Sequence, residues 1–275
     1  MSPHGLDELR VIGVPGIPEV SEGMEVGAEI AARAELRDGD VVVVSQKIVS
    51  KAEGRVLPLA GAIPGTEARR LAAALGKEPA LVELILAESR EVLRAERGVL
   101  IVETNHGFVC ANAGIDTSNL PQDGTVALLP EDPDASARRI RTEITKALEG
   151  EPEEGSSEQQ RGGSAEPSPG SPIIGVVISD SFGRAWRLGQ AEVAIGCAGL
   201  APLDDWRGRA DARGRELSAT LIAIADEAAA AADLVRDKAS RIPASIVRGL
   251  ARYVTSDDGP GAASLRRPRD EDLFR

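Results

Sequence analysis

The segment IIGVVISDSFGRAWRLGQAEVAIGCAG, residues 173–199, decides the expected fold. Its first seven residues are almost all apolar and mostly β-branched, which is typical of a strand buried on both faces. The polar run at 179–183, with a glycine at its end, predicts that this strand stops in a turn and leaves the Asp180 carboxylate at the strand end. The small residues at 194–199 let backbones approach closely, because they carry little or no side chain.

Two guanidinium groups, those of Arg184 and Arg187, follow Asp180. An acid, two positive charges and a closely packed glycine segment are what a site for phosphates and a divalent metal needs. An ordinary buried strand with a solvated turn after it explains the same residues equally well. The segment alone therefore leaves both interpretations open.

Hydrophobic patterns in the rest of the chain alternate between strand-like and helix-like segments. Predicted strands cover residues 9–14, 41–44, 99–103, 125–129 and 244–247, and predicted helices cover 24–34, 67–75, 79–95, a segment starting at Asp132-Pro133, and 216–235. They predict a mixed α/β chain, and its 275 residues can form one large domain or two smaller ones. Residues 150–172 are rich in Glu, Gly, Ser, Gln and Pro without apolar periodicity, so we expect a disordered insertion there.

The charge and the residue counts exclude several function classes. A formal net charge of −12 argues against nucleic acid as a partner, because neutralising its phosphates requires an excess of Lys and Arg. The only cysteines and histidines are Cys110, Cys197, His4 and His106, which excludes a His/Cys metal centre. Oxygen ligands remain, and these favour Mg²⁺ or Mn²⁺. Both cysteines lie among small apolar residues, so we expect buried free thiols.

The chain shows no apolar segment of the roughly 20 residues that a membrane-spanning helix requires, and its N-terminus lacks the pattern of a signal peptide. We therefore expect a cytoplasmic protein that has no membrane partner.

Polar side chains gather where the predicted strands end. The strand at 9–14 is followed by the rigid loop PGIPE at 15–19, and the strand at 41–44 is followed by Ser45, Gln46, Lys47, Ser50 and Lys51. A small polar run at 111–119 contains Asp116 and Asn119. These groups could grip a nucleotide and ligate a metal, whereas solvated strand ends and an Asx-rich turn are the ordinary alternatives. We expect Asp116 and Asp180 to meet at one metal site, delivered by neighbouring strands of one sheet.

The chain contains no Walker A sequence, no G-x-G-x-x-G after a strand and no G-x-S-x-G, which argues against classical nucleotide folds and serine hydrolases. Five other blocks stand out: VPGIPEV (14–20), SQKIVSKAEGR (45–55), ETNHGFVCANAGIDTSN (103–119), LLPEDPDASARRIR (128–141) and ISDSFGRAWRLGQAEVAIGCAG (178–199). In this order they resemble the coenzyme F420-0:L-glutamate ligase family over nearly the whole chain, except the insertion. The resemblance indicates the stand-alone form, without the nitroreductase-like flavin domain of longer relatives.

This resemblance implies the family's α+β fold of mixed sheets with packed helices, in an intertwined homodimer. Residues 1–275 would form a single unit of the family, with room for two subdomains. It also implies ligation of L-glutamate to F420-0 through an acyl phosphate, with GTP converted to GDP and phosphate, followed by γ-linked addition of further glutamates. Mg²⁺ or Mn²⁺ would serve as the cofactor, with K⁺ as a further candidate cation. GTP, L-glutamate and F420-0 would be the small-molecule partners. A non-catalytic GTP- and metal-binding regulator on the same scaffold is the alternative.

The resemblance also implies roles for individual residues. The family's nucleotide-binding positions fall on Gly16, Ile17, Pro18, Glu19, Ser45, Gln46, Lys51 and Asn119, and its divalent-metal positions fall on Asp116, Asp180 and Ser181. Lys51, together with Arg184 or Arg187, would add positive charge to the catalytic set of Asp116 and Asp180. Arg241 stands where some relatives have an acid two residues before a proline, which leaves the ligands of a second metal open. The base for the incoming amine and the number of glutamates added are open as well.

Overall fold

The computed structural model describes residues 8–118, 120, 122–150, 171–236 and 240–273, so most of the insertion predicted at 150–172 lies outside the described residues. The largest sheet has five strands in the order β1-β12-β2-β8-β9. These strands are β1 (Arg10–Gly13), β12 (Ala244–Arg248), β2 (Val41–Ser45), β8 (Gly175–Arg184) and β9 (Arg187–Ala198).

The strand directions bring several chain segments to one edge of this sheet. β12 is antiparallel to both β1 and β2, while β2 is parallel to β8, with Ser45 opposite Ser179. β1, β2 and β8 therefore point the same way, and the residues that follow β1 and β2 meet the C-terminal half of β8. β12 begins at this same edge, since its Ala244 is opposite Val44 near the end of β2.

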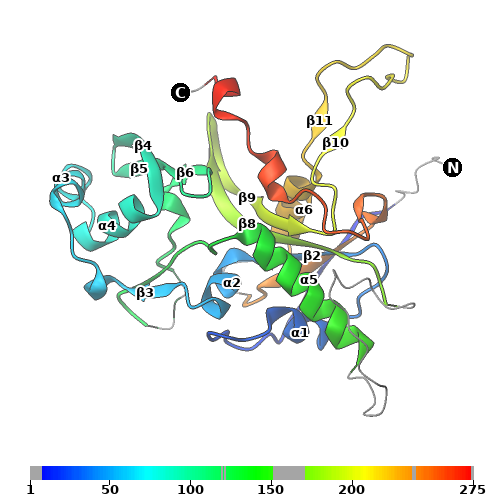
Figure 1. Ribbon diagram of the computed structural model, residues 1–275, viewed down its shortest axis with the longest axis horizontal. Coiled ribbons are helices and arrows are strands. Elements are labelled where there is room, and N and C mark those ends of the chain that lie inside the picture. Colours follow the sequence, from blue (N-terminus) through cyan, green and yellow to red (C-terminus); the bar gives the residue numbers. More distant parts are fainter. Residues whose placement is uncertain (1–7, 119, 121, 151–170, 237–239, 274–275) are drawn as a thin grey trace, which may run out of the picture.

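Helices cover both faces of the main sheet. The four valines of β2 predict a strand buried on both sides, and all four are fully buried. On one face, α1 (Val26–Ala31) and α5 (Pro133–Glu149) share a core with Val42 and Val44. On the other face, α6 (Ile224–Asp233) packs on Val41 and Val43. Figure 1 shows α5 and α6 on opposite sides of the sheet.

A second group of elements has a core of its own, built around Leu71, Val82, Leu100 and Val126. It lies beside the main sheet in Figure 1 and contains α3 (Thr66–Leu75), α4 (Pro79–Ala87), the pair β3 (Val56–Pro58) and β7 (Thr125–Ala127), and the sheet β4 (Ser89–Glu96), β5 (Val99–Thr104) and β6 (Val109–Ala111). α2 (Gln46–Ala52) leads from β2 of the main sheet into this group.

The remaining elements are short. They are the two strands β10 (Asp204–Asp205) and β11 (Leu221–Ile222) of a projecting arm, and the 3-10 helices η1 (Leu59–Gly61), η2 (Asn112–Gly114), η3 (Ala251–Tyr253), η4 (Ala262–Leu265) and η5 (Arg269–Glu271). Together, the helices and mixed sheets confirm the predicted α+β class.

Three predicted elements are wrong in their bounds. β8 continues through the 179–183 run assigned to a turn, because β9 supplies backbone partners along it, and the chain reverses at Ala185 and Trp186. The predicted helix at 79–95 stops with α4, since residues 89–96 alternate between half-buried and exposed positions as β4. The predicted helix at 216–235 shrinks to α6, because Leu221 and Ile222 pair with β10.

Two further predictions concern the cysteines and membrane-spanning helices. Cys110 and Cys197 are free and buried, which confirms the prediction for both thiols. In the part of the chain that the structure describes, no helix is both long and apolar enough to cross a membrane.

Candidate active site

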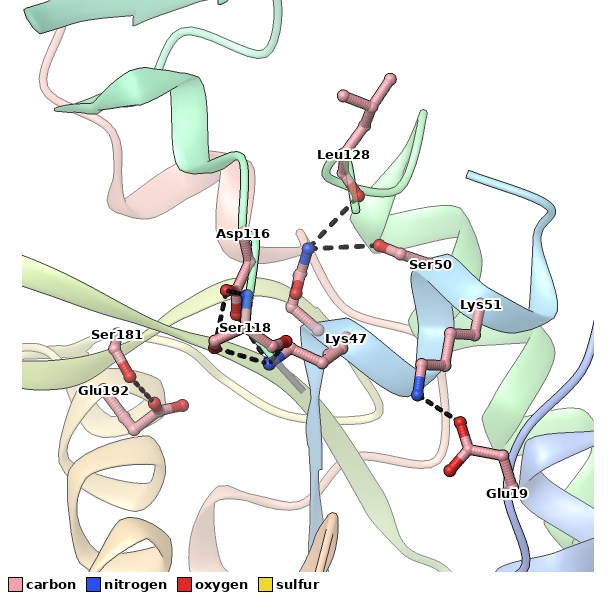
Figure 2. A network of polar contacts seen from close by, with 10 residues as sticks. Glu19, Lys47, Ser50, Lys51, Asp116, Ser118, Leu128, Ser181 and Glu192 are labelled. Atoms are coloured by element: carbon pink, nitrogen blue, oxygen red, sulfur yellow. Dashed lines mark hydrogen bonds and ion pairs between the residues drawn. The ribbon is translucent and has the colours of Figure 1, made fainter. Parts of the chain in front are cut away.

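The candidate site lies along the sheet edge at which β1 and β2 end. α2 begins directly after β2, so the polar residues expected at a strand end stand on the first turns of a short helix instead. Lys47 and Lys51 are four positions apart and share one side of α2. Figure 2 shows three polar groups at this edge: Ser181 with Glu192, then Asp116 with Ser118 and Lys47, and then Lys51 with Glu19.

Asp116 is anchored by backbone and side-chain contacts. Its N–H donates to the carbonyl of Ala127 at 3.0 Å, and its carbonyl accepts from the N–H of Ala127 at 2.8 Å, which ties it to β7. Lys47 Nζ lies 2.8 Å from Asp116 Oδ2, and the N–H and hydroxyl of Ser118 donate to Oδ1 at 2.7 and 2.8 Å. Burial acts to raise the pKa of Asp116, but the contacts with Lys47 and Ser118 outweigh it and hold the pKa below its usual value.

Asp180 lies half-buried in β8, in an environment that opposes its charge. Burial, the negative charge of Glu192 and that of Asp116 raise its pKa to about 7, although the backbone N–H of Ser181 and the charge of Lys47 act in the other direction. A carboxyl group that titrates near neutrality is a feature of functional sites. Asp116 and Asp180 thus lie within electrostatic reach of each other.

Asp116 reaches the candidate site from a different structural element than the sequence predicted. The sequence suggested neighbouring strands of one sheet, but Asp116 pairs with β7 in the second group of elements and only Asp180 belongs to the main sheet. Residues 112–114 make this placement possible through left-handed turns, with φ of 53° at Asn112 and 69° at Gly114. A Cβ on Gly114 would come within 2.9 Å of Leu129, so the glycine is required there.

The negative charges of Glu192 and Asp116 near Asp180 favour the binding of a cation, although the residues that the structure places do not form a complete set of metal ligands there. Among the described residues, no three or more His, Cys, Asp or Glu side chains come together as a ready metal site. Mg²⁺ is usually held by one or two carboxylates together with water and phosphate oxygens, and Asp116 with Asp180 fits this pattern. The hydroxyl of Ser181, a predicted ligand, donates to Glu192 Oε1 at 2.5 Å.

The predicted nucleotide-binding residues come together in part. Lys51 Nζ lies 2.5 Å from Glu19 Oε1, which links the loop after β1 to α2. Lys51 is buried while Glu19 is 70% exposed, so the carboxylate can move away without loss of packing. Gln46 Nε2 donates to Ser50 Oγ and to the carbonyl of Leu128, each at 3.2 Å, and is held inside the protein.

The other predicted residues have varied settings. Gly16 has a φ of 80° and its carbonyl accepts from Arg33 Nε at 2.6 Å, while Ile17 packs on the core and Pro18 is exposed. Ser45 ends β2, and Asn119 lies outside the described residues. Arg184 donates to the carbonyl of Leu188 at 3.0 Å near the exposed end of the β8–β9 hairpin, so the structure does not bring its guanidinium to Asp180.

Sequence reasoning missed four contributors to this edge. Lys47 was noted beside β2 but not as the partner of Asp116, and Ser118, Glu192 and Arg236 were not considered. Lys47 could have been found from its spacing to Lys51 on one helix. Glu192 and Arg236 carry no comparable signal, because one lies in β9, for which the sequence predicted no strand, and the other follows an alanine-rich helix.

Comparisons with known proteins agree with the five sequence blocks. The family model of F420-0:Gamma-glutamyl ligase matches residues 16–153 and 171–249. The coenzyme F420:L-glutamate ligase of Methanothermobacter thermautotrophicus is 41% identical over 273 residues, covering 97% of this chain and 99% of that protein. The ligases of the same name from Methanocaldococcus jannaschii and Methanopyrus kandleri are each 38% identical and cover 98% of this chain, with 97% and 99% of their own lengths aligned. The chain therefore belongs to the F420-0:gamma-glutamyl ligase family.

Proposed function

We propose that this protein ligates L-glutamate to coenzyme F420-0 and then adds γ-linked glutamates. The ligation would be coupled to the conversion of GTP to GDP and phosphate. The ligase names of relatives about 40% identical over nearly the full length support the reaction class. The observation that carries the proposal is the Asp116–Asp180–Lys47 cluster, which places two carboxylates and a lysine at one sheet edge next to Lys51.

The chemistry requires activation of a carboxylate. A carboxylate is a poor electrophile, so joining it to an amine in water needs a leaving group, and phosphorylation by GTP would supply one as an acyl phosphate. A divalent ion bound by Asp116 and Asp180 would supply charge neutralisation for the phosphates. The raised pKa of Asp180 is consistent with this role, because a cation would relieve the repulsion from Glu192 and Asp116.

The protein's own cations would do the remaining electrostatic work. Lys47 holds Asp116 ionised and oriented through the 2.8 Å ion pair. Lys51 is buried, and within the described part of the chain its ammonium group pairs with the exposed Glu19, so an arriving phosphate could take the place of that carboxylate. Several of the predicted nucleotide-binding residues lie close to this lysine in the fold. Glu19 of the loop at 16–19 contacts Lys51, and Ser45 and Gln46 stand at the start of α2, which carries Lys51.

We also propose that the protein works as a homodimer, as the family resemblance implies. The β10–β11 arm extends away from the main sheet in Figure 1, which offers a surface to a second copy. Size-exclusion chromatography with light scattering tests this assembly. A monomeric mass at micromolar concentration would contradict it.

A single assay tests the reaction. The protein is incubated with GTP, MnCl₂ or MgCl₂, L-glutamate and F420-0, and GDP, phosphate and the mass of the F420 product are followed. We expect GDP formation together with a product heavier by one or more glutamates, and parallel reactions with and without KCl test the second cation. Folded protein that gives neither GDP nor a mass increment refutes the ligase and favours the regulator. GDP without a product would indicate a GTPase.

A further inference from the structure

Arg236 is a buried cation that none of the roles above uses. It stands three residues after the end of α6, and its side chain is only 6% exposed. Its Nη2 donates to Ser179 Oγ at 3.1 Å and lies 3.4 Å from Glu192 Oε2. The guanidinium therefore reaches the same end of β8 that carries Asp180.

The contacts of Arg236 leave part of its guanidinium without partners. Nε and Nη1 are both buried, and neither has a hydrogen-bond partner among the described residues. Guanidinium groups have only N–H donors, and a buried donor without an acceptor costs stability. Glu192 does not supply the missing acceptors, because its Oε1 already accepts from Ser181 and its Oε2 faces Nη2. We therefore expect a bound ligand to supply the acceptor for Nε and Nη1 of Arg236.

The pleat of β8 places Arg236 across the strand from the Asp116–Lys47 pair. Val177 belongs to the core on the α6 face, so by alternation Ser179 and Ser181 point to that face as well. Ile178 belongs to the core on the α5 face, so Asp180 points there. A ligand that spans the end of β8 can therefore contact Asp180 from one face and Arg236 from the other.

We propose that Arg236 binds an oxyanion of a substrate, either a phosphoryl or a carboxylate oxygen, at the α6 side of the strand end that carries Asp180. This inference rests on the proposed function for the identity of the substrate. The acidic neighbours Asp180 and Glu192 repel an anion that arrives alone, so the oxyanion enters together with a divalent cation. A guanidinium suits this task because it stays charged and presents several donors to one anion.

Isothermal titration with two probes separates the sources of the oxyanion. The first probe is inorganic pyrophosphate with MnCl₂, and the second is L-glutamate with MnCl₂. We expect Arg236→Met to weaken one of them roughly 10- to 100-fold, the range for loss of a charge-assisted hydrogen bond. Loss of pyrophosphate binding identifies a phosphoryl oxygen, and loss of glutamate binding identifies a carboxylate. If both affinities and the KM values for GTP, glutamate and F420-0 stay unchanged, the inference is wrong.

A double variant separates binding from support of the fold. Arg236→Met leaves Glu192 buried without its cation and lowers the Tm, whereas Arg236→Met with Glu192→Gln removes both charges and restores the Tm in part. Oxyanion binding should stay lost in the double variant, and Arg236→Lys should retain an intermediate affinity. Recovery of wild-type binding in the double variant would assign Arg236 to a structural role and overturn the proposal.

The control is Arg70→Met on α3, where the side chain is 64% exposed and pairs with Glu67. This variant should leave the affinity for both probes unchanged. Because titration needs no turnover, the two proposals fail separately. Anion binding through Arg236 without product formation would refute the ligase reaction alone, and full ligation by a folded Arg236→Met variant with normal KM values would refute the role of Arg236 alone.

Discussion

Lys47 and Asp116 form an ion pair, with Nζ 2.8 Å from Oδ2, that joins α2 to the chain segment leading into β7. Lys47 Nζ also donates to the carbonyl of Ser118 at 2.8 Å, while Ser118 donates twice to Asp116. The three residues form a closed network at the contact between the main sheet and the second group of elements. A divalent ion at Asp116 would have to compete with the ammonium group of Lys47.

Replacing Lys47 with methionine tests this competition. The ion pair is largely shielded from solvent, with side-chain exposures of 18% and 33%, so its loss should cost about 1–3 kcal/mol of metal-free stability. Without the ammonium group, the Asp116 carboxylate should bind Mn²⁺ more tightly. We expect a lower Tm in EDTA and a larger rise in Tm on addition of MnCl₂, measured by scanning fluorimetry.

Lys146→Met is the matched control, because Lys146 is exposed in the last turn of α5 and takes no part in the contacts described for the site. It should change neither the Tm in EDTA nor the response to MnCl₂. An equal or smaller Mn²⁺ response in Lys47→Met than in the wild type would show that Lys47 does not compete with a metal.

The raised pKa of Asp180 predicts how stability depends on pH. In the folded protein this pKa is about 7, against about 3.9 for Asp in an unfolded chain. The folded state therefore holds the proton more tightly, and the stability that this provides is present at low pH and is lost as the pH rises from about 4 through 7. Asp180→Asn resembles the protonated form. In EDTA its Tm should match the wild type below about pH 4, where Asp180 is protonated in both states, and exceed it by an amount that grows up to about pH 8.

Asp123→Asn, on an exposed turn, serves as the control for this experiment and should run parallel to the wild type at every pH. If the curve of Tm against pH for Asp180→Asn also runs parallel to the wild type, the carboxyl group of Asp180 does not titrate in this range. The repulsion from Glu192 and Asp116 would then be too weak to matter.

Gly196 in β9 tests the packing that supports the site. A Cβ there would lie 2.2 Å from the carbonyl oxygen of Pro133, at the start of α5. The start of this helix cannot shift freely, because Asp134 accepts from the N–H of Cys197 at 2.9 Å and from that of Ala262 at 2.7 Å. Gly196→Ala should cost roughly 2–4 kcal/mol in urea unfolding.

Gly183→Ala is the comparison for Gly196→Ala. Gly183 lies in the neighbouring strand β8, and a Cβ there meets no heavy atom within 4 Å. This substitution should change the free energy of unfolding by less than about 1 kcal/mol. Equal losses in the two variants would mean that glycine is needed for backbone freedom rather than for contact with α5.

Four strands of the main sheet, β1, β2, β8 and β12, could be predicted from the sequence because each is centred on an apolar run, whereas β9 was not predicted. The valines at 41–44 and the apolar residues at 173–178 have no helical periodicity, and both became central strands. The predicted boundaries failed where local composition competes with pairing. Residues 179–183 look like a turn, yet β9 pairs with them and extends β8, and residues 89–96 look helical by their apolar residues although the alternation of burial is that of a strand.

The candidate site was predictable in its residue types but not in its geometry. Asp116 and Asp180 were identified by their small polar surroundings and by the family resemblance, and they lie within electrostatic reach of each other. The link to Lys47, however, depends on a contact between two groups of elements, which local sequence patterns do not contain. Arg236 depends on where α6 ends, and the predicted helix at 216–235 obscured that boundary.

The last prediction concerns the joint action of Asp116 and Asp180. If both hold one divalent ion, Asp116→Asn and Asp180→Asn should each abolish most metal-dependent GDP formation, and the double variant should lose little more than either single variant, because groups that act as a unit are non-additive. The fold should survive, since Asp180 is half-buried with a raised pKa and Asp116 keeps its backbone ties to Ala127. Titration of Mn²⁺ followed by electron paramagnetic resonance measures the binding directly. Losses that multiply as independent factors, or normal Mn²⁺ binding by Asp116→Asn, would leave Asp116 as a turn residue held by Lys47 and Ser118.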